Sequence, residues 1–186
     1  ITRWQLVSHL LEAPERVVRL QAAAQLLDIP PEQMRGDDIK RLRDAQDAYL
    51  AAQQANADDT SAQLNIGVFY QTRGQLALAE DAYQRAIELD PYFIAAYVNL
   101  ADLYRASFRD PDAERLLKTG LQQLPEAAPL HFSLGLLNVR NKQMDQALSA
   151  LRKAVTLDPD TSRYRYVLAV GLNSTGQRAE ALAELE

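Results

Sequence analysis

Residues 60–93 read TSAQLNIGVFYQTRGQLALAEDAYQRAIELDPYF, and this stretch decides the fold. Its apolar and small residues recur at steps of three and four, which is typical of amphipathic helices. They fall into two groups, which are Ile66, Gly67 and Tyr70, then Ala79, Tyr83 and Ala86. Gly74 lies between the groups, where the end of a helix favours a left-handed backbone. The stretch therefore predicts a hairpin of two helices.

The same pattern returns every 34 residues along the rest of the chain. Proline, alanine and large apolar residues each form a column with this period, namely Pro91, Pro125 and Pro159; Ala79, Ala113, Ala147 and Ala181; Tyr83, Leu117, Leu151 and Leu185. A further column contains isoleucine or leucine, and each of these residues is followed directly by glycine or alanine, as in Ile66-Gly67, Leu100-Ala101, Leu134-Gly135 and Leu168-Ala169. Each proline ends a second helix, because the residue before proline disfavours the α conformation. Several independent columns with one period predict a repeat protein.

Small residues in these columns predict that the two helices of each hairpin pack closely. Gly67 and Ala79 belong to opposite helices of the first hairpin, and their equivalents recur in the later ones. One hairpin cannot bury both of its faces, so we expect successive hairpins to stack into an all-α solenoid. A large residue in place of Ala113 should overpack this contact, at a cost of about 1–3 kcal/mol.

The pattern resembles the tetratricopeptide repeat (TPR), whose consensus is W-x2-L-G-x2-Y, then A-x3-F, then P. The first repeat matches it with Ile66, Gly67, Tyr70, Ala79, Tyr83 and Pro91. The resemblance covers residues 58–186, with repeats at about 60–93, 94–127, 128–161 and 162–186. It implies a right-handed α-solenoid, in which helix A of each repeat packs against helix B.

The fourth repeat stops at Glu186, before the last turns of its helix B, and the chain begins with Ile1 instead of methionine. We therefore expect a fragment of a longer protein. The inward face of the last repeat should be partly open. A partner, a neighbouring molecule in a crystal or a further segment is expected to cover it.

Residues 1–57 lack the complete repeat pattern. The segment 37–57 predicts one helix that caps the repeats, since Tyr49 lies 34 residues before Tyr83. Asp37 or Asp38 fits the N-cap of that helix. Residues 1–36 predict two further helices and a linker; the helices are expected at 4–11 and 14–27, and the linker contains Pro30 and Pro31.

The stretch VRLQAAAQLL at residues 18–27 resembles the second helix of a HEAT-type repeat, so residues 1–36 are interpreted as HEAT-like. We interpret Arg16 and Arg19 there as surface or loop-bridging charges. The order of HEAT-like helices, a PPEQ linker and TPR units is similar to the C-terminal region of certain bacterial multihaem cytochrome c proteins. That resemblance implies a periplasmic parent with redox cofactors upstream; without it, the parent would be cytoplasmic. The compartment is therefore left open.

Composition excludes several classes of function. The 186 residues include no cysteine, which rules out disulfides, thiol catalysis, iron–sulfur ligation and c-type haem attachment within the chain. With 20 basic and 25 acidic side chains, the net charge of −5 disfavours nucleic-acid binding, including by an RNA-reading helical repeat. No apolar run approaches the roughly 18–20 residues that cross a bilayer. We expect no cofactor in this chain, no nucleic acid and no membrane span.

Catalytic residues are scarce. The two histidines are His9 and His131, and His131 occupies the first, aromatic consensus position of its repeat, so we interpret it as a half-buried packing residue. The carboxylate pairs Asp37-Asp38, Asp58-Asp59 and Glu80-Asp81 fit helix starts or solvated faces. No phosphate-binding loop or nucleophile motif is present. We therefore predict no enzyme and no metal site.

The TPR resemblance implies that ligands contact one face of the A helices, which lines a concave groove. The candidate partner-binding residues are Leu64, Asn65, Val68, Val98, Asn99, Asp102, Arg105, Phe132, Leu136, Arg140, Arg163, Tyr166 and Val170. Some of them could instead pack between adjacent A helices. Leu64 and Val68 occupy positions where the family's clamp for C-terminal carboxylates has lysine and asparagine, so a chaperone-tail clamp is not expected.

The chain is thus interpreted as a non-catalytic scaffold that binds an apolar or amphipathic segment of a protein partner in the groove. Three alternatives stay open. The chain could self-associate through the groove or the open C-terminal repeat, it could be the accessory tail of a periplasmic multihaem cytochrome, or it could assist an enzyme encoded in adjoining sequence.

Overall fold

A computed structural model describes residues 3–185, and every regular element in that range is helical. Ile1, Thr2 and the predicted end of the fourth repeat at Glu186 lie outside the described residues. The chain divides into two compact units, Ile1–Leu89 and Asp90–Glu186, called unit 1 and unit 2 below. The all-α solenoid fold expected from the 34-residue period is confirmed.

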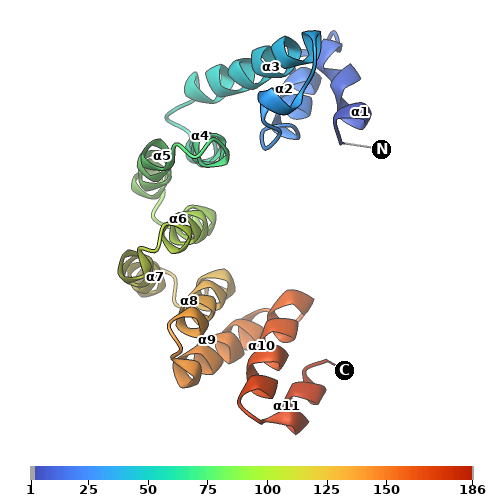
Figure 1. The fold of residues 1–186 in the computed structure, drawn as a ribbon. Coiled ribbons are helices and arrows are strands. Elements are labelled where there is room, and N and C mark those ends of the chain that lie inside the picture. Colours follow the sequence, from blue (N-terminus) through green and yellow to red (C-terminus); the bar gives the residue numbers. More distant parts are fainter. Residues whose placement is uncertain (1–2, 186) are drawn as a thin grey trace. The chain divides into compact units, whose positions relative to one another are not determined.

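Unit 1 contains the N-terminal helices and the first complete repeat (Figure 1). Its elements are α1 (Arg3–Val7), the 3-10 helix η1 (Ser8–Glu12), α2 (Arg16–Ala24), the 3-10 helix η2 (Pro31–Gln33), α3 (Asp37–Gln54), α4 (Thr60–Thr72) and α5 (Leu76–Leu89). The helix predicted over residues 4–11 changes from α to 3-10 geometry at Ser8, so that prediction of one continuous helix is wrong. Helix α2 begins after Pro14, with Glu15 as its N-cap.

The predicted cap of α3 is also wrong. Gly36, with a φ of 57°, is the N-cap, and no side chain caps the helix. Asp37 and Asp38 instead lie in its first turn, where carboxylates favour the positive end of the helix dipole. Asp38 accepts hydrogen bonds from the Trp4 indole Nε1 at 3.3 Å and from Arg41 Nη1 at 3.1 Å, because its side chain points back toward α1.

The core of unit 1 joins α2, α3 and α4. Ala23, Leu27, Tyr49 and Phe69 form one buried cluster. The buried Gln46 of α3 donates hydrogen bonds from Nε2 to the carbonyls of Leu26 and Ile29, at 2.9 and 3.1 Å. Arg19 bridges the loop before α2 by donating to the carbonyls of Ala13 and Pro14. These contacts place α3 between the N-terminal helices and the first repeat.

Unit 2 contains three successive hairpins. Its helices are α6 (Ile94–Ala106), α7 (Asp110–Gln123), α8 (Ala128–Arg140), α9 (Met144–Leu157), α10 (Ser162–Ser174) and α11 (Arg178–Ala183), with α6, α8 and α10 as the A helices (Figure 1). Helices α5, α7 and α9 end at Leu89, Gln123 and Leu157. Each end lies two residues before a proline of the 34-residue column, as the sequence predicts.

The turns between A and B helices share one backbone conformation. Their left-handed residues, 34 apart, are Gly74 (φ 68°), Phe108 (φ 58°), Lys142 (φ 60°) and Gly176 (φ 83°). The expected left-handed backbone at Gly74 is confirmed. The repeat imposes this conformation even where the residue has a side chain, and a bulky residue such as Phe108 is rarely found there.

The predicted close packing of A and B helices is confirmed at the glycines. A Cβ atom added at Gly67 would lie 2.3 Å from Cε1 of Tyr83, and one added at Gly135 would lie 2.7 Å from Cγ of Leu151. Tyr83 and Leu151 are fully buried. The hydroxyl of Tyr83 also donates a hydrogen bond to Oε1 of Gln71, at 2.7 Å. In the first and third repeats, the B helix therefore fills the space that the A-helix glycine leaves.

Candidate partner-binding surface

The first consensus position of the A helices has a structural role in three repeats. Gln63 Nε2 lies 2.6 Å from the carbonyl oxygen of Ala57, and the Tyr97 hydroxyl 3.1 Å from that of Pro91. Nε2 of His131 lies 2.9 Å from the carbonyl oxygen of Pro125. In each case the partner is six residues earlier, in the loop before the helix. His131 is thus a partly buried packing residue that ties down this loop.

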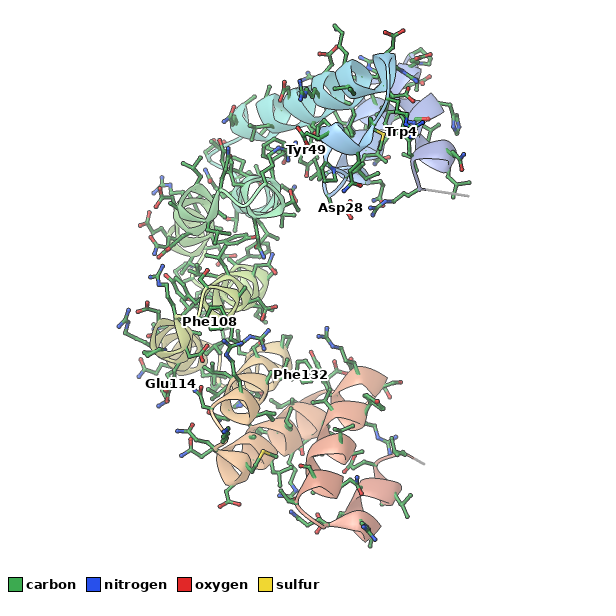
Figure 2. The ribbon with its side chains drawn as sticks, viewed as in Figure 1. Trp4, Asp28, Tyr49, Phe108, Glu114 and Phe132 are labelled. Carbon is green, nitrogen blue, oxygen red and sulfur yellow. The ribbon has the colours of Figure 1, made fainter. Side chains whose placement is uncertain are left out.

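Phe132 is the one predicted groove residue that is fully part of the core. Its side chain is only 5% exposed, and its ring packs on that of Tyr164 with a centroid distance of 4.6 Å. The Arg163 guanidinium carbon lies 5.1 Å from the centroid of the same ring. Figure 2 shows Phe132 where α8 meets α10. Phe132 therefore stacks one A helix on the next, which is the alternative that the sequence left open.

The other apolar candidates divide by unit. In unit 1, Leu64 and Val68 are half-buried on α4. In unit 2, Val98 is half-buried on α6, and Leu136 packs at the edge of the core cluster that contains Phe132. Tyr166 and Val170 of α10 are exposed. The exposed apolar part of the predicted set thus lies at α10.

The polar candidates form local pairs. Asn65 donates from Nδ2 to Oε1 of Gln53 at 3.1 Å. Arg105 pairs with Asp102 on the next turn of α6, with Nη2 and Oδ1 2.8 Å apart. Asn99 is half-buried on the same helix. All of these side chains are half-buried, so their charged and amide groups lie at the surface of the helices.

Arg140 belongs to a cluster that the sequence did not predict. Its Nε donates to Oδ2 of Asp110 at 2.9 Å, and its guanidinium carbon lies 4.9 Å from the centroid of the Phe108 ring. Phe108 is 83% exposed on the strained turn between α6 and α7 (Figure 2). The signal was present in the sequence as an aromatic residue in the glycine column, 34 residues after Gly74.

A pocket of about 310 Å³ lies on α10 and α11. Tyr166 and Val170 line it together with Leu182, Leu185 and two small residues of the repeat columns, Ala169 and Ala181. Arg178 contributes a cation to its lining. This pocket brings the exposed apolar groove residues together with residues of helix B that the groove prediction did not include.

Two family models described as "Tetratricopeptide repeat" match residues 61–93 and 98–162. Together they cover more than half of the chain. The first match corresponds to the first repeat, and the second match spans the second and third repeats. The chain belongs to the tetratricopeptide repeat family. Neither model describes a cytochrome, so the resemblance of this TPR protein to multihaem cytochromes stays a prediction.

Known proteins with TPR regions are similar over much of this chain. Protein O-mannosyl-transferase TMTC3 of Homo sapiens is 28% identical over 137 residues, which are 66% of this chain and 15% of that protein. The crystal structure of TTC0263, a thermophilic TPR protein in Thermus thermophilus, has a TM-score of 0.65 at 24% identity and covers 89% of this chain and 86% of that one. The structure of YrrB, described as "a TPR protein with an unusual peptide-binding site", has a TM-score of 0.53 at 16% identity, covering 100% of this chain and 89% of that one.

These likenesses support different conclusions. The two solved structures are less than 25% identical to this chain and show the TPR fold alone. TPR repeats generally act as non-catalytic scaffolds, although TMTC3 is named as a transferase. Because this chain spans only a small part of the length of the curated relatives it matches, their whole-protein activities do not carry over to it.

Two findings bear on other functions of the TPR protein. Across residues 3–185, His, Asp and Glu side chains nowhere gather in a group of three that could hold a metal ion. None of the described helices combines the length and apolar character needed to cross a membrane.

Burial raises the pKa of Tyr97 and Tyr164, with Asp90 and Asp158 adding to the effect, so both hydroxyls stay neutral well above neutral pH.

Proposed function

We propose that this TPR protein is a protein-interaction scaffold, whose unit 2 binds a segment of a partner on a surface formed by its A helices and the turn between α6 and α7. The observation that carries this proposal is Phe108. It presents an exposed aromatic ring from a left-handed backbone, which costs a non-glycine residue about 1–2 kcal/mol. Strain of this kind gathers at functional sites, where a side chain is needed in spite of it.

The surroundings of Phe108 indicate the chemistry of the partner. Arg140 lies over the ring and pairs with Asp110, while Arg105 pairs with Asp102 nearby in sequence on α6. An apolar side chain of the partner would pack on the ring, and a carboxylate would approach the guanidinium groups, which can each donate several hydrogen bonds. We therefore propose a segment that combines apolar and acidic residues, without a cofactor or nucleic acid.

The test separates binding from stability. A library of random peptides is selected on the wild-type chain, and the affinities of the selected peptides are measured for wild type and Phe108→Gly. Glycine relieves the left-handed strain, so this variant should be at least as stable as wild type and yet bind the peptides at least tenfold more weakly. Tyr92→Ser is the matched control. Tyr92 is also an exposed aromatic residue, but it lies just before the first residue of α6, at the other end of that helix from Phe108. Equal affinities for wild type and Phe108→Gly would overturn the proposal.

Two other functions rest on different observations. The apolar pocket on α10 and α11 favours self-association, which sedimentation at several protein concentrations tests directly. The order of HEAT-like segment, linker and TPR repeats favours the accessory tail of a periplasmic multihaem cytochrome. Reading the parent gene upstream of residue 1 tests this second alternative, because it requires CxxCH haem-attachment motifs there.

A further inference from the structure

We propose that a groove between α7 and α9 binds an extended segment of a partner protein through the side-chain amide of Asn138. The inference rests on the proposed interaction function and adds a second surface to it, whose lining does not include Phe108 or Arg140. The groove has a volume of about 640 Å³ and lies within unit 2, where α7, α8 and α9 line it. Glu114 marks its α7 side in Figure 2.

Asn138 departs from the repeat pattern at the bottom of this groove. The other three repeats have a large side chain at the equivalent position, namely Tyr70, Tyr104 and Leu172. Tyr104 is 6% exposed and Leu172 is 1% exposed. Asn138 is as deeply buried, at 4%, but its side chain is shorter and polar. The third repeat therefore has a polar amide and free space where its neighbours have a ring or a leucine.

The amide of Asn138 has no partner of its own. Within residues 3–185 its side chain makes no hydrogen bond, although buried amides are normally paired. In the same range, the one fully enclosed side-chain polar atom that lacks a partner is Oδ1 of Asp110. The Asn138 amide is therefore open to solvent, and the groove that it lines provides the opening. Its Nδ2 can donate and its Oδ1 can accept hydrogen bonds there.

A peptide group matches this amide, because it also has one acceptor and one donor. Its carbonyl would accept from Nδ2, and its N–H would donate to Oδ1. In an α-helix these backbone groups are already paired with each other, whereas in an extended segment they are free. Leu121, Leu134 and Ala150 add apolar surface to the groove, one from each of its three helices. The occupant is thus an extended segment with an apolar side chain beside the paired peptide group.

Two charges on the α9 side indicate how the segment is oriented. Asp145 and Lys153 both line the groove, and neither forms an ion pair with any other residue of the range 3–185. The backbone N–H of Gln143 donates to the carbonyl of Asn138 at 2.9 Å, which places the start of α9, and Asp145 with it, beside Asn138.

The spacing of these charges gives the spacing in the partner. Lys153 follows Asp145 by eight residues, or ~12 Å along a helix that rises ~1.5 Å per residue. An extended chain rises about 3.3 Å per residue and covers this distance in about four residues. We therefore expect a basic residue opposite Asp145 and an acidic residue four positions later, opposite Lys153, because complementary charges favour one partner and one direction.

Other occupants fit the groove less well. The hairpins on both sides of it are complete, so it is not the end of the array. A further repeat after residue 186 would stack on α10 and α11 and leave this groove open, and its helices would offer no free peptide group. In a second copy, the longest connection between the helices of residues 3–185 is 25–30, which forms turns. A free extended segment of a partner avoids these problems.

The probe is a set of heptapeptides that carry arginine at the second position, valine or leucine at the fourth and glutamate at the sixth. The remaining positions are threonine or serine, since β-branched residues favour the extended conformation. Each peptide carries fluorescein and is titrated with the 186-residue chain, with fluorescence anisotropy as the readout. We expect saturable binding. Its absence from the whole set would overturn the inference.

Replacement of the amide tests its role directly. Asn138→Leu should stay folded in urea unfolding, because leucine occupies the equivalent position 172 in the fourth repeat. It should bind the heptapeptides at least tenfold more weakly, since it leaves a buried peptide group unpaired. Methylation of one backbone nitrogen of the peptide should weaken binding to wild type by a similar factor and leave binding to Asn138→Leu unchanged. If no methylated position behaves in this way, the inference fails.

An exchange of the two charges gives a test that misfolding cannot imitate. The double variant Asp145→Lys with Lys153→Asp keeps the net charge of the chain. It should prefer heptapeptides with glutamate second and arginine sixth, which is the reverse of the wild-type preference. Lys40→Glu, which changes an exposed lysine of α3 in unit 1, should leave the affinity as it is. The same preference in wild type and the exchanged variant would overturn the proposed orientation.

Two comparisons separate this inference from its alternatives. Phe108→Gly should bind the heptapeptides as wild type does, and Asn138→Leu should bind the library-selected peptides that depend on Phe108 as wild type does. The two surfaces therefore succeed or fail independently. The full-length product of the parent gene should bind the heptapeptides with the affinity of the 186-residue chain. Binding at least tenfold weaker there would mean that a segment of the same polypeptide occupies the groove, and would overturn the proposal of a partner.

Discussion

The third and fourth repeats share several apolar residues at equivalent positions, yet they bury different sets. Leu151 of α9 is fully buried, whereas its equivalent Leu185 is 59% exposed. Leu151 packs against Gly135 of its own hairpin and lies in the cluster covered by α10. In the fourth repeat, α11 ends at Ala183, before Leu185 is reached. Burial in this fold is therefore set jointly by the hairpin and by the neighbour that stacks on it.

The largest expected effect comes from truncating the two equivalent leucines. Leu151→Ala should lower the free energy of unfolding by about 2–5 kcal/mol, because it leaves a cavity beneath α10. Leu185→Ala should change it by less than about 0.5 kcal/mol, since the side chain is largely in solvent. Urea unfolding followed by far-UV circular dichroism measures both. Similar losses in the two variants would show that the fourth repeat is packed as tightly as the third.

A second, smaller effect comes from enlarging the alanine column. Ala147 lies between α8 and α9 with no exposed surface, so Ala147→Leu should overpack the hairpin and cost about 1–3 kcal/mol. Ala181→Leu should cost less, because the shorter α11 borders the open pocket and can move outward. Thermal unfolding of the two variants compares them. An equal or larger loss for Ala181→Leu would contradict the comparison.

A third prediction concerns the turns of the two repeats, which differ in their left-handed residue. Lys142→Gly should stabilise the third repeat by roughly 0.5–1 kcal/mol, as relief of strain exceeds the added flexibility of the unfolded chain. Gly176→Lys should destabilise the fourth repeat by a similar amount, for the opposite reason. Urea unfolding of the two variants and the wild-type chain measures these changes in the free energy of unfolding. A loss of stability in Lys142→Gly would mean that the lysine side chain stabilises the turn.

Much of the fold was predictable because a single period fixed many positions at once. Each column reflects one local requirement. The column of Gly67 marks a close approach of two helices, that of Ala79 a position that needs a small side chain, and that of Pro91 the end of a helix. Helix boundaries from α4 to α10 follow from them. The first 36 residues lack a period, and there the change from α to 3-10 geometry at Ser8 and the cap at Gly36 depended on tertiary contacts and backbone conformation.

The candidate surface was harder to predict for a physical reason. A position on the face of an A helix can contact a ligand or the next A helix, and the period alone does not distinguish them. Phe132 is buried while Tyr166, at the same position one repeat later, is exposed. Phe108 and Lys142 both replace glycine in the column of left-handed turn residues, and only the contact with Arg140 and the high exposure distinguish Phe108 as a candidate binding residue.

The smallest expected effect tests the junction between the two repeats through pH. Burial, and after it the charge of Asp158, raises the pKa of Tyr164, which lies on α10 against Phe132. A raised pKa in the folded state means that the folded chain holds the phenolic proton more tightly than the unfolded chain. The stability from this hydroxyl is therefore complete below the unfolded pKa near 10 and is lost as pH rises through the folded pKa.

Tyr164→Phe should consequently lose less stability than wild type between about pH 9 and pH 11, a range that brackets the unfolded tyrosine pKa. The measurement is the difference between urea unfolding free energies at the two pH values, so any constant effect of removing the hydroxyl cancels. Burial also raises the pKa of Tyr49 in unit 1 and of Tyr97 in α6, so the loss should be reduced but not abolished. Tyr49→Phe should act in the same direction in unit 1. A slope in Tyr164→Phe as steep as that of wild type would mean that α10 does not shield this position from water, and that the third repeat is as open at its end as the fourth.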